Sequence, residues 1–177
     1  MKQPVDDEAI QPDNTLLLMQ IMGDIQNRTY VELVRDVQSK VQNSINNNEI
    51  PEGEAPVTHH FAPNVYMRQM DAKAGTLVVS KMHRTEHLNI LLKGGVTVIT
   101  ENGIEYLKAP MILKSMPGTK RIGYFHEDSS WVTVHPTEQT NVDEIEKEVI
   151  VPEEEVDLFL KSIGYESKEF KLCHGEQ

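Results

Sequence analysis

The strongest constraint on the fold is a series of short β-branched and aromatic runs in the middle of the chain, separated by turn-forming residues. Gly94-Gly95 and Asn102-Gly103 mark two of the turns, and Asn-Gly is a strong hairpin signal because both positions tolerate a positive φ. About eight short strands at this spacing predict a β-sandwich or a β-barrel whose interior holds side chains or one small ligand. The runs are residues 65–70, 77–82, 87–92, 96–100, 104–108, 111–114, 121–125 and 131–134.

Helical periodicity replaces the strand pattern before this region. Thr29 and Glu32 have the spacing of a capping box, which begins a helix. Apolar residues then recur at intervals of three and four, which predicts one apolar stripe on that helix. The stripe packs on the chain's own barrel or contacts a second copy or another partner, and the pattern leaves both alternatives open. The stripe consists of Tyr30, Val34, Val37, Val41 and Ile45.

Three further segments are predicted to be helical. One begins near Asp13, a short acidic one covers residues 141–149, and the last begins at Pro152 and ends at Gly164. The acidic residues that follow Pro152 lie in a first helical turn, where the helix dipole favours them. We therefore expect a helical arm and linker over residues 1–56, a β-barrel over residues 57–137 and a helical tail over residues 138–177.

Charge and composition exclude several classes of protein. The chain has 17 Lys and Arg against 28 Asp and Glu, a formal net charge of -11, whereas a duplex nucleic-acid binder needs a surplus of cations for the phosphates. The longest near-continuous apolar run, residues 16–22, is far shorter than the ~20 residues of a bilayer span. Cys173 is the only cysteine, which excludes an intrachain disulfide and a cysteine-based zinc site. These features predict a cytoplasmic protein that does not associate with a membrane.

The residues that most suggest chemistry lie between Gly75 and Gly94. Strand alternation places Lys81 and His83 on one face. A turn through residues 84–86 would then bring His87 back beside His83 on the next strand. Two neutral imidazoles presented in this way suit Zn, Fe, Ni or Cu.

The same stretch resembles the first sequence motif of the cupin superfamily, in which a His-x-His pair is followed by a glutamate and then by a glycine. His87 stands at the glutamate position, His83 at the second histidine and Lys81 at the first, and a glycine follows at the expected distance. Residues 116–121 resemble the second cupin motif at Gly118, and Arg121 stands at its histidine position.

The resemblance implies a mainly β fold: a double-stranded β-helix (jelly-roll) barrel with an N-terminal helical arm and a short C-terminal helix. Residues 60–149 are also similar to uncharacterised cupin-like proteins associated with bacteriophage genomes. That similarity implies an accessory role during infection and, for a phage-encoded protein, the host cytoplasm. Cupins commonly form dimers, so the resemblance also implies a homodimer.

The chain departs from the usual cupin metal site, which has three histidines and one carboxylate. Lys81 and Arg121 replace two of these ligands by cations, and a cation beside a metal is electrostatically costly. His135 is the best candidate for a third ligand, because a hairpin about residues 127–129 would set it opposite Arg121. The remaining histidines of this region are His59, His60 and His126. His126 is expected at the surface, and His59 and His60 lie at the surface or cap the mouth of the barrel.

These observations leave three functional hypotheses open. The first is a metal-free cavity whose cations and histidines bind a small anionic molecule, such as a sugar phosphate or a nucleotide. The second is a metal-dependent isomerase, epimerase or dioxygenase, with one divalent transition metal (Zn, Fe, Mn or Ni) on His83, His87 and His135. The third is a structural or interaction protein that uses the helical arm. The candidate ligand-binding residues are Lys81, His83, His87, Arg121 and His135, with Tyr66 and Arg68, which alternate along the first strand and line the same wall or the outside.

Overall fold

The computed structural model describes residues 29–166, in which short strands occupy the middle of the chain and helices lie on either side of them. The helical segment expected from Asp13 and the single Cys173 lie outside the described residues. The strands are β1 (Val57–Ala62), β2 (Val65–Ala72), β3 (Leu77–Val79), β4 (Met82–His83), β5 (His87–Lys93), β6 (Gly95–Thr100), β7 (Gly103–Lys108), β8 (Met111–Ser115), β9 (Ile122–Phe125), β10 (Ser129–Pro136) and β11 (Ile150–Val151). The helices are α2 (Tyr30–Asn46), α3 (Val142–Val149), the 3-10 turn η1 (Glu153–Glu155) and α4 (Val156–Ser162).

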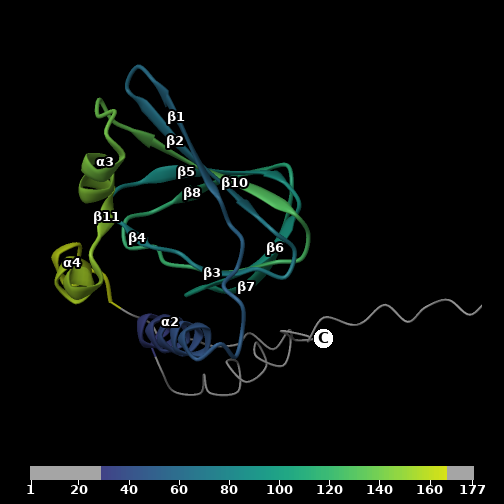
Figure 1. Ribbon diagram of the computed structural model, residues 1–177. Helices are drawn as coiled ribbons and strands as arrows, with labels where there is room; N and C mark the ends of the chain where they lie inside the picture. Colours follow the sequence, from purple (N-terminus) through teal and green to yellow (C-terminus); the bar gives the residue numbers. More distant parts are fainter. Residues whose placement is uncertain (1–28, 167–177) are drawn as a thin grey trace, which may run out of the picture.

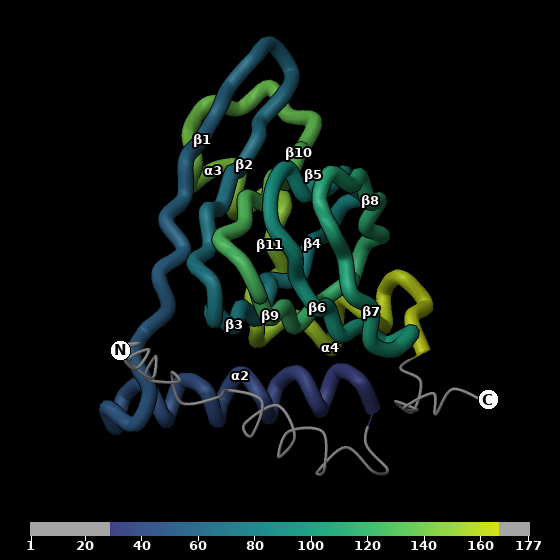
Figure 2. The backbone as a smooth tube through the Cα atoms, turned by 90° about the vertical axis from the view of Figure 1, so that its right-hand side faces the viewer, coloured from purple at the N-terminus to yellow at the C-terminus, as the bar shows by residue number. Residues whose placement is uncertain are grey.

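The strands form two antiparallel sheets that face each other. The larger sheet has the order β1-β2-β10-β5-β8, the smaller one has the order β3-β9-β6-β7, and β11 pairs with β4 beside them. Without β1, the orders 2-10-5-8 and 3-9-6-7 are those of a jelly roll, in which successive strands cross between two sheets. The predicted double-stranded β-helix is therefore confirmed, and Figures 1 and 2 show its barrel above α2.

The turn chemistry that predicted the strands is present in the structure. The Asn102-Gly103 turn connects β6 to β7, and Thr100 lies opposite Gly103 in the register of this hairpin. Gly103 has a φ of 119°, a conformation that residues with a side chain rarely adopt. The hairpin between β6 and β7 therefore depends on this glycine.

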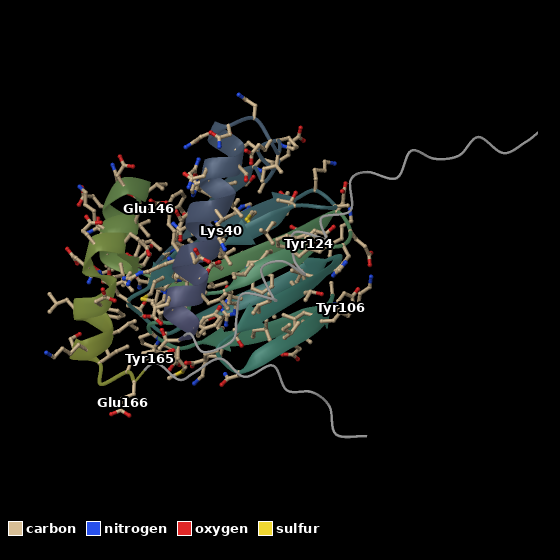
Figure 3. The ribbon with its side chains drawn as sticks, turned by 90° about the horizontal axis from the view of Figure 1, so that it is seen from below. Lys40, Tyr106, Tyr124, Glu146, Tyr165 and Glu166 are labelled. Carbon is tan, nitrogen blue, oxygen red and sulfur yellow. The ribbon has the colours of Figure 1, made fainter. Side chains whose placement is uncertain are left out.

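Helix α2 packs on the outer face of the smaller sheet. Its buried stripe lies against Ile99 of β6 and Ile122 of β9. The Tyr30 hydroxyl lies 2.8 Å from the carbonyl oxygens of Ile99 and Lys120, and Thr29 forms the predicted capping box with Glu32. Of the two alternatives for the apolar stripe, the structure therefore has the contact with the chain's own barrel. Figure 3 shows α2 lying across the sheet, with Tyr106 and Tyr124 on the part that it leaves uncovered.

The C-terminal helices close one end of the barrel. Ile145 and Val149 of α3 pack against Tyr66 of β2, and α4 packs against Met82 of β4. Strand β11 follows α3 and pairs with β4, where Ile150 lies opposite His83. The tail of the chain therefore holds the short strand that carries one of the candidate histidines. No described helix is long and apolar enough to cross a membrane.

Two details of the predicted strands are wrong. The run over residues 77–82 is divided, because β3 pairs with β9 whereas β4 pairs with β11. Lys81 lies in the gap between β3 and β4, outside both strands, and is exposed. The polar segment of β1, which includes His59 and His60, is a strand that the β-branched pattern did not reveal.

The predicted hairpin that paired Arg121 with His135 is also wrong. Strand β9 pairs with β3 and β6, whereas β10 pairs with β2 and β5, and His135 lies opposite Tyr66. The loop over residues 126–128 therefore crosses from one sheet to the other. This crossing is a property of the jelly roll, and a short loop between two strands does not distinguish it from a hairpin.

Candidate functional site

A cavity of ≈ 260 Å³ lies between the two sheets, with α3 and β11 at its edge. Its lining comes from both sheets, because alternate residues of each strand point into a barrel. All seven residues that the sequence singled out as ligand-binding candidates line this cavity. They are Tyr66, Arg68, Lys81, His83, His87, Arg121 and His135.

Three histidines from three different strands converge in the cavity. His83 belongs to β4, His87 begins β5 and His135 lies near the end of β10. The ring centroids of His83 and His87 are 4.1 Å apart, and that of His135 is 4.9 Å from the first and 4.8 Å from the second. One nitrogen from each ring lies within 4.8 Å of the others.

Local contacts fix the orientation of these rings. The Nδ1–H of His87 donates to the backbone oxygen of Thr85 at 3.0 Å, because a carbonyl only accepts. Nε2 of His87 is therefore the unprotonated nitrogen, whose lone pair can bind a metal. It lies 3.0 Å from Nδ1 of His83. Nδ1 of His135 is buried and has no hydrogen-bond partner among the described residues. An unpartnered buried nitrogen is costly, so it indicates a ligand at this position.

The three imidazoles are neutral at physiological pH. Burial, followed by the neighbouring His87 and His135, lowers the pKa of His83 to about 2. Burial and His87 lower the pKa of His135 to about 4, and burial also lowers the pKa of His87. Neutral imidazole is the form that binds metals.

The donor set fits a divalent transition metal. The potential ligands that cluster within the described residues are three histidines and no carboxylate, and three histidines with an open fourth position form a common catalytic zinc site. The converging nitrogens and the unpartnered Nδ1 of His135 support this fit. The cavity supplies space for a further ligand beside the histidines.

Two guanidinium groups lie on the cavity wall beside the histidines. Burial lowers the pKa of Arg121, and the positive charges of Arg68 and Arg121 both act on His83. Within the described residues neither guanidinium forms an ion pair. Lys81 differs, because its Nζ lies 2.9 Å from Glu146 of α3 and its side chain is 60% exposed. The two arginines are therefore the available cations of the cavity, and Lys81 is a paired residue at its edge.

A polar group that the sequence interpretation missed lies deeper in the cavity. The Oδ1 atom of Asn89 accepts hydrogen bonds from Nε1 of Trp131 at 3.0 Å and from the Thr133 hydroxyl at 3.4 Å. Its Nδ2 donates to the hydroxyl of Ser115 at 2.6 Å. Strand alternation was the available signal, since Asn89 follows His87 by two residues on β5, and Thr133 precedes His135 by two on β10.

The other histidines do not reach the three-histidine cluster. His126 is exposed, as predicted, and its Nε2 lies 2.7 Å from the Thr97 hydroxyl. Nδ1 of His59 lies 2.7 Å from the Tyr66 hydroxyl, and burial raises the pKa of Tyr66. His59 therefore contacts a cavity residue from the neighbouring strand.

Comparison with known proteins identifies similar folds only. No family model matches the chain, and no curated protein is significantly similar to it. A double-stranded β-helix protein from Klebsiella pneumoniae has a TM-score of 0.43 and 20% identity, over 52% of this chain and 84% of that one. An RmlC-like cupin from Shewanella frigidimarina has a TM-score of 0.42 and 13% identity, over 49% and 79%. A variant of salicylate 1,2-dioxygenase from Pseudoaminobacter salicylatoxidans has a TM-score of 0.45 and 8% identity, over 62% and 34%.

Similarity at this level carries no information about ligand or reaction. The architecture of the chain itself is specific, because its two sheets have the jelly-roll orders 2-10-5-8 and 3-9-6-7. The chain thus has the double-stranded β-helix fold of the cupin superfamily, with a cavity between its sheets in which three histidines converge.

Proposed function

We propose that the cavity binds one divalent transition metal through His83, His87 and His135, and a small anionic molecule through Arg68 and Arg121. The observation that carries the proposal is the convergence of three neutral imidazoles, one with a buried and unpartnered Nδ1. Such a group is costly without a ligand and suits a transition metal.

The arginines support the anionic ligand. Two guanidinium groups in a partly dry cavity bind a carboxylate or phosphate through charge-assisted, bidentate hydrogen bonds. They also repel a metal cation, and an anion bound between the metal and the arginines offsets this repulsion. The metal and the anion should therefore each strengthen the binding of the other. This site lies in a chain whose net charge is -11, so its positive character is local.

Binding alone and metal-dependent catalysis both use this arrangement. A bound divalent metal would act as a Lewis acid toward a coordinated oxygen. Arg68 and Arg121 orient the acid group, and the barrel wall excludes water from it. Among the described residues, Glu146 is the one carboxylate on the cavity wall, and it is paired with Lys81. A specific isomerase, epimerase or dioxygenase activity and an accessory role in phage infection stay predictions.

A metal-free anion site is the second candidate. The guanidinium groups of Arg68 and Arg121, which form no ion pair within residues 29–166, favour it. In that case the ligand would be a small anion such as a sugar phosphate or a nucleotide. The third hypothesis, an interaction through the helical arm, has less support because α2 buries its apolar stripe on the smaller sheet.

The test is metal analysis of the full chain, purified without an affinity tag and dialysed after incubation with Zn, Fe, Mn or Ni. We expect close to one equivalent of metal in the wild type and none in the His83→Ala, His87→Ala double variant. His126→Ala removes an exposed histidine outside the cavity and should retain the metal. Failure of the wild type to retain any of the four metals would contradict the metal site and leave the metal-free candidate.

A further inference from the structure

The cavity has an ordered change of polarity along its length. Residues of β10 point into it at steps of two, and the register of the larger sheet gives their neighbours on β2 and β5. The histidine layer therefore lies at one end and an apolar layer at the other, with a polar layer between them. The layers are His135 with Tyr66, then Thr133 with Arg68 and Asn89, then Trp131 with Met70 and Leu91.

The smaller sheet extends the apolar end across the cavity. Val98 lies opposite Gly123, and Val96 lies opposite Phe125 in the pairing of β6 with β9. Six of the apolar side chains that line the cavity are Met70, Val78, Val96, Val98, Phe125 and Trp131, and the others are Val79, Ile145, Val149 and Ile150. A ligand at this end of the cavity would contact aromatic and branched aliphatic side chains.

Apart from the Arg68 guanidinium, the side chains of the polar layer are hydrogen-bonded within the layer. Asn89 uses its oxygen for Trp131 and Thr133, and it uses its amide nitrogen for Ser115. Each of these four side chains therefore has a hydrogen-bond partner within the group. A ligand hydroxyl buried beside them would lose its hydrogen bonds to water without full replacement, which is unfavourable.

We infer that the anionic ligand is a small carboxylic acid with an apolar body, either a single aromatic ring or a short branched aliphatic group. Its carboxylate would lie at Arg68, Arg121 and the histidines, and its body would lie between Trp131 and Val98. The inference rests on the proposed function for the position of the acid group, and it replaces the hydroxyl-rich sugar phosphate or nucleotide suggested by the sequence. The cavity of ≈ 260 Å³ lies just below the range of about 300–1,000 Å³ for ligand pockets, which also favours a small body.

Calorimetry on the zinc-loaded full chain tests the inference with three carboxylates that differ in their bodies and with two phosphates. Benzoate and cyclohexanecarboxylate have apolar bodies and gluconate is a polyhydroxy acid, whereas ribose 5-phosphate and inorganic phosphate carry a phosphate group in place of the carboxylate. We expect both apolar acids to bind at least tenfold more tightly than gluconate and ribose 5-phosphate. Equal or tighter binding of gluconate or ribose 5-phosphate would overturn the inference and leave the anion site intact. Binding of none of the probes would overturn both the inference and the proposed anion site. The metal content of the same sample reports on the metal site separately.

Two substitutions distinguish binding of the ligand's apolar body from binding of its acid group. Val98→Thr adds a hydroxyl at nearly constant volume and should weaken benzoate about tenfold, with inorganic phosphate unchanged. Arg68→Gln should weaken benzoate and phosphate by similar factors. Val134→Thr makes the same change as Val98→Thr on a strand residue outside the cavity and should alter neither. A Val98→Thr protein that binds benzoate as the wild type does would contradict the apolar site, and the wild-type series stands independently if this variant fails to fold.

Discussion

Asn89 organises the polar layer of the cavity, because one amide side chain satisfies three neighbours. Its partners are the indole of Trp131 and the hydroxyls of Thr133 and Ser115. Asn89 is 3% exposed, and Ser115 is fully buried. Water therefore has little access to replace a lost hydrogen bond in this layer, and each partner depends on the amide.

Removal of this amide should destabilise the protein. We expect Asn89→Ala to lower the free energy of unfolding by roughly 2–4 kcal/mol, because buried donors and acceptors lose their partners. Urea denaturation followed by circular dichroism measures the change. Asn43→Ala, at an exposed position of α2, is the control and should change stability by less than about 0.5 kcal/mol. A similar stability for both variants would contradict the role of Asn89.

Asp71 on the outer side of the larger sheet provides a prediction about pH. Hydrogen bonds from the Ser130 hydroxyl at 2.6 Å and from Gln69 lower the pKa of its carboxyl group. Because the folded pKa lies below the unfolded value of about 3.9, the ionised carboxylate stabilises the fold above that pH. This contribution is lost as the pH falls through the folded pKa.

The Ser130→Ala substitution removes the first of these two donors. We expect the pKa of Asp71 to rise toward its ordinary value, and the loss of stability with acid to become shallower below about pH 4. Carboxyl chemical shifts in an NMR titration measure this pKa. Asp128 is an internal control, because Lys73 and the backbone amide of Ala74 lower its pKa instead. An unchanged titration of Asp71 would show that Ser130 does not set its pKa.

At the scale of elements, α2 is a helix whose stability comes from one face. Leu33, Val34 and Val37 are at most 2% exposed, and all three belong to the cluster that includes Ile99 and Ile122 of the smaller sheet. The capping box at its first turn fixes where the helix begins. The same helix buries the outer side of the two strands, β6 and β9, that carry cavity residues on their inner side.

Truncation of a side chain on the buried face of α2 should therefore lower the stability far more than truncation of one on its exposed face. We expect Leu33→Ala to lower the free energy of unfolding by about 2–5 kcal/mol, because it leaves a cavity between helix and sheet. Gln38→Ala, on the exposed face of α2, should have an effect within about 0.5 kcal/mol. Chemical denaturation compares the two. Equal effects would mean that α2 does not pack on the barrel in solution.

At the scale of the whole molecule, the three-histidine cluster links distant parts of the chain. His83 is held by β4 and β11, His87 by β5 and His135 by β10. A ligand that binds all three histidines joins the larger sheet to the β4–β11 pair and so to the C-terminal tail. Binding to the folded state alone stabilises it against unfolding.

Metal should accordingly raise the melting temperature of the entire chain. At a zinc concentration of 100 times Kd, the stabilisation is about 2.7 kcal/mol, which for a chain of this size corresponds to roughly 5–10 °C. Differential scanning calorimetry of the chelator-treated protein, with and without zinc, measures the shift. The His83→Ala, His87→Ala double variant should show none, and an equal shift in that variant would place the zinc elsewhere.

The homodimer implied by the cupin resemblance stays a prediction, which sedimentation equilibrium at several concentrations would test. The cytoplasmic location also stays a prediction. The exposed apolar side chains of the described residues include Leu88, Leu92 and Ile112 on the outer face of the larger sheet.

The sequence by itself determined the local elements and the general architecture. Turn residues such as Asn102-Gly103 and the alternation within short runs specify strands, because both act over a few residues. The three- and four-residue spacing of the stripe from Tyr30 specified α2 in the same way. His83 and His87 could be placed together because only a short turn separates them.

Only the tertiary structure decided which distant residues share the cavity. His135 reaches His87 because β10 pairs with β5, not because of the hairpin with Arg121 that the sequence predicted. Lys81 lies outside the strands because its run divides between two different pairing partners. Strand pairing depends on contacts between residues far apart in the chain, and a short loop permits either a hairpin or a crossing between sheets. Local patterns therefore predict the strands, whereas packing of the whole barrel selects their neighbours.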